Sequence, residues 1–292
     1  MPERVEKIGT AKSAERGASE EAIQAHYDVG NDFYALWLDP TMTYSCAIWD
    51  NENEDLATAQ KRKIDYHIDQ ARAANAESVL EIGCGWGACL DSLVNRHNVA
   101  RAIGLTLSAA QAKWISRMGL KKAEVRIENW INHRPDDKYD AIISLAAMPH
   151  FVKPELGPSE RIDVYRDFFE RCYEWLKPGG RLTVETQVYG CGEFTLHSPL
   201  SGVFPESDMP KFSELSAGFD GVFDLENIVN HRRHYPPTLK RWLHNLSKNR
   251  EQASRASSSD TVTKFERFLE AGIKGHSLGV FELLRFTFTK AW

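Results

Sequence analysis

The sequence predicts an α/β fold in which helices cover both faces of a mostly parallel sheet. The first observation is an alternation of strand and helix patterns between residues 78 and 188. The second is a glycine-rich turn, VLEIGCGWG at residues 79–87, which joins the first of these strands to a helix. The third is size: 292 residues, 42% of them hydrophobic, suit one large domain with a substantial core.

The chain before this alternation predicts two segments. Residues 1–20 are charged and weakly periodic, so a loose N-terminus is expected there. Residues 21–75 are expected to form a helical cap, with a long helix over residues 56–74. Asn31 or Asp32 is expected to cap a shorter helix within it.

The alternating core is expected over residues 76–189. Its predicted strands are residues 78–83, 100–107, 123–129, 139–147 and 181–188. Its predicted helices are residues 87–97, 108–119 and 161–180, of which the second starts at a Ser108 cap and the third stops at Pro-Gly-Gly. Residues 190–270 break the pattern and predict a lid insertion, and residues 271–292 return to the core as final strands.

Composition limits the function and the setting. A net charge of −5 gives no reason to expect nucleic acid or an anionic membrane as a main partner. The apolar runs are too short to span a bilayer, so no stable membrane insertion is expected. The five cysteines include no CxxC pair, which indicates free thiols, a reducing cytoplasmic location and no metal site.

The glycine turn indicates a ligand at the carboxyl edge of the sheet, because backbone N–H groups can approach closely there. Neither the G-x-G-x-x-G of dinucleotide sites nor the Gly-Lys-Ser/Thr of phosphate loops is present. The tighter spacing of Gly83, Gly85 and Gly87, with Glu81 two residues before the first, is typical of S-adenosylmethionine methyltransferases. A turn used only for packing is the alternative.

Several longer motifs resemble the cyclopropane-fatty-acid synthase family of S-adenosylmethionine-dependent methyltransferases, over about residues 20–292. They are HYDVGNDFYALWLDPTMTYSCAIW, VLEIGCGWG, GLTLSAAQ, HYPPTLKRWLHNL and FELLRFTFTKAW. The family includes lipid cyclopropane synthases, mycolic acid methyltransferases, plant alkaloid N-methyltransferases and natural-product C-methyltransferases. The resemblance implies a Rossmann-like class I methyltransferase fold with S-adenosyl-L-methionine as cofactor.

The resemblance also implies which residues contact the cofactor. The methionine part of the cofactor would contact Tyr44, Ser45 and the glycine turn. The ribose would lie near the end of the next strand, and the adenine would lie against a tryptophan. These residues are Tyr44, Ser45, Gly83, Gly85, Gly87, Thr106, Gln111 and Trp130. The family often has Glu after that Trp, whereas Ile131 stands here.

A second set of residues concerns the proton released during methyl transfer. Lipid cyclopropane synthases resemble one another in holding a bicarbonate between a Cys, a Glu-His pair, a fifth-strand His and a late Tyr. Cys46, His150 and Tyr235 match this set, but Pro149 replaces the Glu and Glu185 replaces the fifth-strand His. We therefore expect Glu185 to act as the base in place of bicarbonate, with His150 and Tyr235 beside it. A hydrogen bond from Glu185 to the lid is the alternative.

These observations predict a methyltransferase that acts on carbon or nitrogen of a small, partly apolar specialised metabolite. A cyclopropane synthase or methyltransferase acting on unsaturated acyl chains is the first alternative. A catalytically inactive cofactor-binding module is the second. The expected partner is a small-molecule acceptor, and a homo-oligomer is left open. Aromatic residues expected near the acceptor are Phe33, Tyr34, Phe151, Tyr189 and Trp242.

Overall fold

The computed structural model describes residues 17–27, 29–51, 53–191 and 203–291, so most of the segment expected to be loose, residues 1–16, lies outside the described residues. The described chain forms a seven-stranded sheet in the order β3-β2-β1-β4-β5-β7-β6. The strands are β1 (Ser78–Ile82), β2 (Arg101–Thr106), β3 (Ala123–Ile127), β4 (Tyr139–Leu145), β5 (Leu176–Tyr189), β6 (Asp224–Asn230) and β7 (Phe281–Thr289). Strands β1 to β5 pair in parallel, and β7 runs antiparallel to both β5 and β6. The predicted α/β fold is confirmed.

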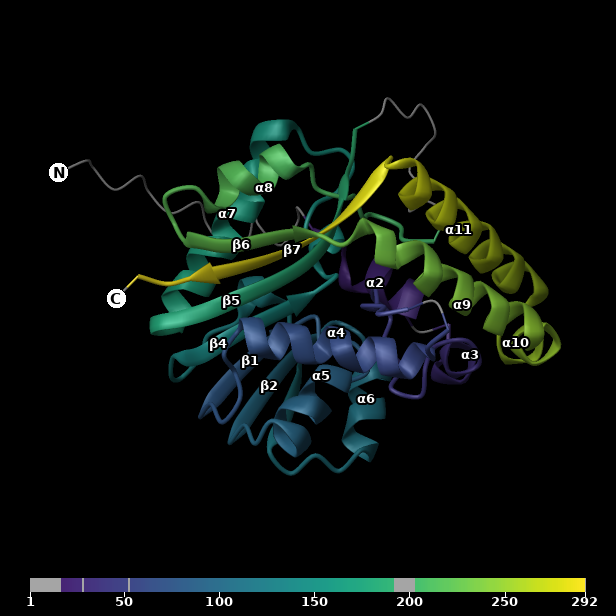
Figure 1. Cartoon of the computed structure of the whole chain (residues 1–292), viewed down its shortest axis with the longest axis horizontal. Coiled ribbons are helices and arrows are strands. Elements are labelled where there is room, and N and C mark those ends of the chain that lie inside the picture. The colour runs from purple at the N-terminus through teal and green to yellow at the C-terminus, as the bar shows by residue number, and fades with distance from the viewer. Residues whose placement is uncertain (1–16, 28, 52, 192–202, 292) are drawn as a thin grey trace.

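Helices cover both faces of this sheet (Figure 1). On one face lie α4 (Leu56–Gln70), α5 (Ala88–Asp91) and α6 (Ala109–Arg117). On the other lie α7 (Pro158–Trp175) and α8 (Phe212–Phe219). Successive side chains of a strand point to opposite faces, so Val79 packs toward α4 while Leu80 packs toward α7.

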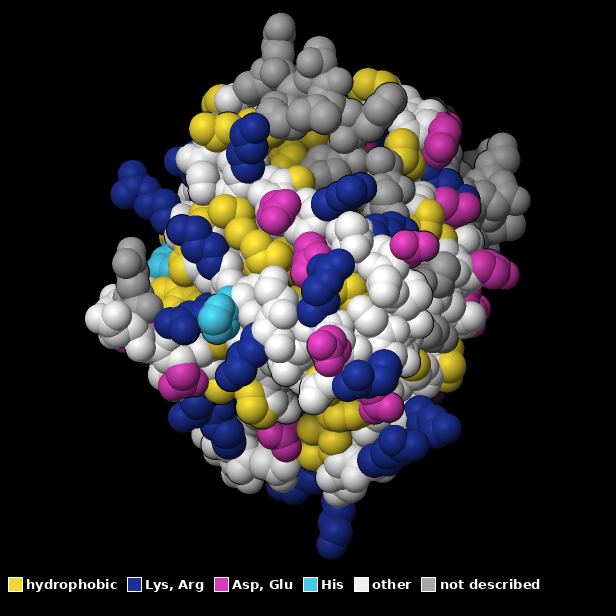
Figure 2. Space-filling view, turned by 90° about the vertical axis from the view of Figure 1, so that its right-hand side faces the viewer, with side chains coloured by type: hydrophobic (Ala, Val, Ile, Leu, Met, Phe, Trp, Pro, Cys, Tyr) yellow, Lys and Arg dark blue, Asp and Glu magenta, His cyan; other side chains and the backbone are white. Residues whose placement is uncertain are grey.

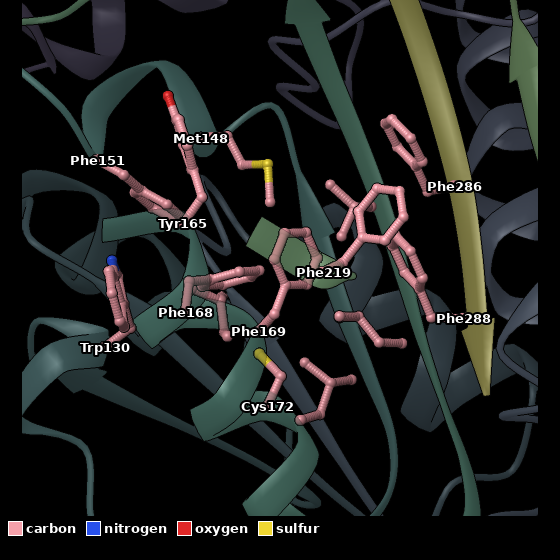
Figure 3. Close-up of a cluster of buried hydrophobic side chains, with 14 of the residues drawn as sticks. Trp130, Met148, Phe151, Tyr165, Phe168, Phe169, Cys172, Phe219, Phe286 and Phe288 are labelled. Carbon is pink, nitrogen blue, oxygen red and sulfur yellow. The ribbon is translucent and has the colours of Figure 1, made fainter. Parts of the chain in front are cut away.

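The core beneath α7 and α8 is rich in aromatic rings (Figure 3). Phe168 and Phe169 of α7 point toward Phe286 and Phe288 of β7, with Phe219 of α8 between them. The rings of Phe169 and Phe288 lie 5.3 Å apart in an edge-to-face arrangement, which is favourable for aromatic pairs. This packing fixes β5 and β7, the strands that bear the residues of interest below.

The remaining helices gather at one end of the molecule (Figure 1). They are α2 (Glu20–Tyr27), α3 (Asn31–Ala35), α9 (Tyr235–Lys248), α10 (Arg250–Ala256) and α11 (Ser259–Leu278). A second core of buried aromatic and aliphatic side chains joins α3 to α9 and α11. On the surface of this end, basic side chains are interspersed with acidic and apolar ones (Figure 2). None of the helices in the described part of the chain has the length and apolar character needed to cross a bilayer.

Element boundaries differ from the expectations in several places. Helix α3 begins after Gly30, so neither Asn31 nor Asp32 caps it as predicted, and α4 ends at Gln70 instead of Ala74. The helix after the glycine turn is short, because α5 passes into a π-helical turn over Ser92–Arg96. Strand β5 begins before the Pro-Gly-Gly turn, and its pairing with β4 shifts register there. The range expected as one lid insertion, 190–270, includes β6 of the main sheet and α8, which packs on α7. From that range, α9, α10 and most of α11 belong to the helical end of the molecule, and in the described part of the chain β7 is the one strand that follows them.

Candidate active site

The glycine turn lies at the carboxyl end of β1, and all three glycines have positive φ: 78° at Gly83, 52° at Gly85 and 86° at Gly87. A Cβ at Gly83 would lie 2.7 Å from Ala147, and one at Gly87 would lie 2.8 Å from Ile115. A Cβ at Gly85 would meet nothing within 4 Å. Gly83 and Gly87 therefore allow close packing, whereas Gly85 leaves its backbone open to a ligand.

A cavity of about 1110 Å³, including its open mouth, lies at this edge of the sheet. We call it the strand-end cavity. Seven residues expected at the cofactor line it: Tyr44, Ser45, Gly83, Gly85, Thr106, Gln111 and Trp130. Gly87, expected with them, does not, because it faces Ile115 of α6 instead. Ile131, which stands where the family often has Glu, also lines the cavity.

Local contacts hold these lining residues in place. Ser108 caps α6 by accepting a hydrogen bond from the Gln111 backbone, which confirms the predicted cap. Thr106 donates its hydroxyl proton to Gln111 Oε1 at 2.6 Å, so the two side chains form one unit. Trp130 presents part of its ring to the cavity while it packs on Phe151, 5.1 Å away between ring centroids.

Three charged residues of the strand-end cavity, Lys63, Glu81 and Glu128, were not assigned a role from sequence. Lys63 of α4 is fully buried and donates to Ser45 Oγ at 2.6 Å. Burial raises the pKa of Glu81 to about 8, and Lys63 partly opposes that rise. Glu81 Oε2 has no hydrogen-bond partner among the described residues. The position of Glu81 two residues before the first glycine could have indicated a role at the site. No motif surrounds Lys63 in its helix, so the sequence offered no such indication for Lys63.

A second cavity of about 740 Å³ lies between β5, α9 and α11, and we call it the helical cavity. Its walls are largely aromatic and aliphatic, and no Asp, Glu, Lys or Arg is among its described lining residues. The polar residues of its lining are Tyr27, Tyr44, His150, Gln187, Ser207, Tyr235 and His276. Of the aromatic residues expected near the acceptor, only Trp242 lines it, and Phe151 lines the strand-end cavity.

The two cavities share four lining residues: Tyr27, Tyr44, Ala146 and His150. Ala146 has a φ of 60°, a left-handed conformation that is uncommon outside glycine. Its N–H donates to the Glu185 carbonyl at 2.8 Å, which holds the loop after β4 against β5. Such strained positions gather at functional sites. The shared wall is therefore the place where ligands of the two cavities would meet.

His150 lies in this shared wall with both ring nitrogens engaged. Nδ1 lies 2.7 Å from Ser207 Oγ, and Nε2 lies 3.2 Å from the Tyr27 hydroxyl. Burial lowers the pKa of His150 to about 4, so the imidazole is neutral at pH 7. Both partners are hydroxyl groups, which can donate or accept, so either nitrogen can hold the proton.

The other residues matched to the bicarbonate site separate into two groups. Tyr235 lines the helical cavity and accepts a hydrogen bond from Gln187 Nε2 at 2.5 Å. Pro149 also lines that cavity. Cys46 lines neither cavity, and burial raises the pKa of its thiol to about 12. A protonated, buried thiol fits packing and not nucleophilic attack.

Glu185 is fully buried in β5 and lines neither cavity. It faces Arg285 directly across the β5–β7 pair. Arg285 Nε donates to Glu185 Oε2 at 2.8 Å, and Arg285 Nη2, which donates to the Cys46 carbonyl, lies 2.6 Å from the same carboxylate oxygen. Burial raises the pKa of Glu185, but the charges of Arg285 and Lys63 outweigh burial and hold that pKa well below its usual range. The structure thus places the expected base outside the described lining of both cavities, in a buried ion pair and with little tendency to take a proton.

The comparisons with known proteins agree with this geometry. The family model for mycolic acid cyclopropane synthetase matches residues 14–286. Cyclopropane mycolic acid synthase 2 of Mycobacterium leprae is 32% identical over 259 residues, which cover 80% of this chain and 82% of the relative. Among solved structures, the cyclopropane synthase MmaA2 of Mycobacterium tuberculosis superimposes with a TM-score of 0.85 at 28% identity, covering 94% of this chain and 99% of the other.

A second solved structure is mycolic acid cyclopropane synthase CmaA1 complexed with SAH and CTAB, with a TM-score of 0.83 at 26% identity. The superposition covers 94% of this chain and 100% of that protein. SAH is the product that S-adenosylmethionine leaves after methyl transfer, so the cofactor predicted from the glycine turn agrees with this complex.

Proposed function

The chain belongs to the mycolic acid cyclopropane synthetase family and is an S-adenosylmethionine-dependent methyltransferase, and we propose that it methylates an unsaturated carbon of an uncharged, largely apolar acceptor. One observation carries the proposal: an uncharged, aromatic-lined cavity meets the strand-end cavity at a shared wall. Two ligands in these cavities would touch at Tyr27, Tyr44, Ala146 and His150, as a displacement in line with the transferred methyl group requires.

The strand-end cavity fits the cofactor. The open backbone at Gly85 offers polar groups to an amino-acid end. So do the Tyr44 hydroxyl and Glu81 Oε2, neither of which has a hydrogen-bond partner among the described residues. In this proposal Tyr44, Ser45, Gly83 and Gly85 hold that end, Thr106 and Gln111 the ribose, and Trp130 the adenine. The bound cofactor supplies an electrophilic methyl group on a sulfonium.

The helical cavity favours a carbon acceptor over a nitrogen acceptor. An amine becomes a lasting ammonium when it is methylated, and the described lining of this cavity offers no carboxylate to pair with it. An alkene carbon gives a short-lived carbocation, which the faces of Tyr44, Tyr235 and Trp242 can stabilise. The names of the relatives favour an acyl chain over the specialised metabolite expected from sequence.

His150 is the group we propose for taking the proton. It lies in the shared wall and is neutral at pH 7. Although burial makes it a weak base, a carbocation is so strong an acid that a weak base suffices. The hydroxyls of Tyr27 and Ser207 hold the ring in position. A catalytically inactive cofactor-binding module would not need a neutral imidazole in the wall between the two cavities.

The test uses S-adenosylmethionine with a labelled methyl group. The purified protein is incubated with a cell extract and with unsaturated fatty acyl thioesters, and products are identified by mass spectrometry. We expect the label on a carbon of an apolar product. Label found only on amine nitrogens would overturn the acceptor class, and S-adenosylmethionine binding without any labelled product would revive the inactive-module alternative.

A further inference from the structure

His276, in the last turn of α11, lies in the wall of the helical cavity and has not entered the chemistry above. Its Nδ1 lies 2.8 Å from the carbonyl oxygen of Gly272, one helical turn earlier. A carbonyl oxygen can only accept a hydrogen bond, so Nδ1 must carry the proton. Burial lowers the pKa of His276 to about 4, so the ring is neutral at pH 7 and holds no second proton.

These facts fix Nε2 as a bare acceptor. Its lone pair is buried, because His276 is only 4% exposed, and Nε2 has no hydrogen-bond partner among the described residues. The imidazole packs against the ring of Tyr235, with centroids 4.4 Å apart, and against the ring of Phe281, at 5.6 Å. A buried acceptor without a donor costs about 1–3 kcal/mol, so the cavity is incomplete as it stands.

We propose that Nε2 of His276 accepts a hydrogen bond from the acceptor molecule, which therefore carries a hydroxyl or N–H group besides its apolar body. The inference rests on the proposed function and narrows its substrate class. Because the described lining holds no charged side chain, the donor is neutral, as in an alcohol, a phenol or an amide. A purely hydrocarbon tail would leave Nε2 unpaired and would bind less tightly than a tail that carries a donor at this point.

The other polar groups that line the helical cavity are less suited than His276 to accept a hydrogen bond from the acceptor molecule. The Tyr235 hydroxyl already accepts from Gln187, and both nitrogens of His150 lie beside hydroxyls. Tyr44 has an unpartnered hydroxyl, but it lies in the wall shared with the strand-end cavity. Among the described nitrogen atoms of the lining, Trp242 Nε1 and His276 Nε2 lack a hydrogen-bond partner. The indole N–H of Trp242 can only donate, so His276 Nε2 is the one of the two that can accept a hydrogen bond.

The experiment uses the full chain with SAH bound and two neutral probes of equal size, 2-naphthol and 2-methylnaphthalene. Titration calorimetry measures both affinities in the wild type, in His276→Phe, and in His244→Phe as a matched control on the exposed face of α9. We expect the wild type and the control to prefer naphthol about tenfold more than His276→Phe does. In protein labelled with ¹⁵N-histidine, naphthol should shift the Nε2 resonance of His276, and methylnaphthalene should not.

The outcomes separate the two proposals. Failure of SAH to bind would overturn the proposed function itself. SAH binding with the same naphthol preference in the wild type and His276→Phe would overturn only the role of His276. An Nε2 resonance that already reports a hydrogen bond and does not move would mean that water fills the place, and it would equally defeat the proposal. If His276→Phe fails to fold, the resonance experiment on the wild type decides alone.

Discussion

The strand-end cavity and the helical cavity share a wall but are built by different means. Loops at the ends of parallel strands form the first, with charged groups such as Lys63 and Glu81 in its lining. Side chains of α9, α11 and β5 form the second, without a charged residue in its described lining. The difference shows that a backbone turn can serve one fixed ligand, whereas the choice of acceptor depends on scattered side chains.

The largest effect that separates the cavities is expected at the glycine turn. Gly85→Val should project a side chain into the strand-end cavity and weaken SAH binding at least about a thousandfold, or about 4 kcal/mol. Gly119→Val is the matched control, because Gly119 also has positive φ and open space but lies outside both cavities. Calorimetry showing equal SAH affinity in both variants would contradict the assignment of the strand-end cavity to the cofactor.

The next effect concerns the buried ion pair between β5 and β7. Glu185→Gln should lower the free energy of unfolding by about 3 kcal/mol, because Arg285 stays buried without its counter-charge. Since the pKa of Glu185 is depressed in the folded state, its contribution is complete above the ordinary value of 4.5 and fades in more acidic solution. Urea unfolding at several pH values measures both features.

Glu251→Gln is the control for this variant, because its pair with Arg255 is exposed and should change stability by less than about 0.5 kcal/mol. The competing prediction, that Glu185 is the base, requires the opposite result. Turnover would then fall by about 10²–10⁴ in Glu185→Gln while stability and SAH affinity stayed normal. Stimulation by bicarbonate would point to the anion of the family instead.

A smaller effect is expected in the shared wall. His150→Ala should reduce turnover about a hundredfold, because a positioned base is removed, while SAH affinity changes little. His244→Ala, outside both cavities, should leave turnover unchanged. Methyl transfer is followed with labelled cofactor on whichever acceptor the extract experiment identifies. Normal turnover in His150→Ala would assign the proton to another group.

The smallest effect is a pH dependence confined to the strand-end cavity. With a pKa of about 8, Glu81 is protonated in the free protein at pH 7. An ammonium group in the bound ligand favours the carboxylate, so SAH should bind about tenfold more tightly per pH unit between 6 and 8, and level off above. Glu81→Gln should flatten this profile. A flat profile in the wild type would mean that Glu81 stays protonated when SAH binds.

The parallel sheet was predictable because its signals are local. The strand patterns, the Ser108 cap and the glycine turn each lie within a few neighbouring residues. Strand β6 was missed because it is an edge strand with largely exposed side chains, so its sequence lacks an apolar pattern. The residues predicted to contact the cofactor line one cavity, except for Gly87, which faces α6.

The environment of Glu185 could not be predicted, because it depends on tertiary pairing. Its partner Arg285 is 100 residues away and faces it only through the antiparallel register of β5 and β7. The lining of the helical cavity could not be predicted for the same reason. Of the expected aromatic residues, Trp242 alone lines it, while Phe33, Tyr34 and Tyr189 line neither cavity. His276 belongs to no motif, and its importance comes from one hydrogen bond to Gly272.

The shared wall has a thermodynamic consequence. Tyr27, Tyr44, Ala146 and His150 border both cavities, so a ligand that orders them on one side prepares them for a ligand on the other. Binding at the two sites is then linked, and the linkage is reciprocal. By whatever factor SAH changes the affinity for 2-naphthol, 2-naphthol must change the affinity for SAH by the same factor.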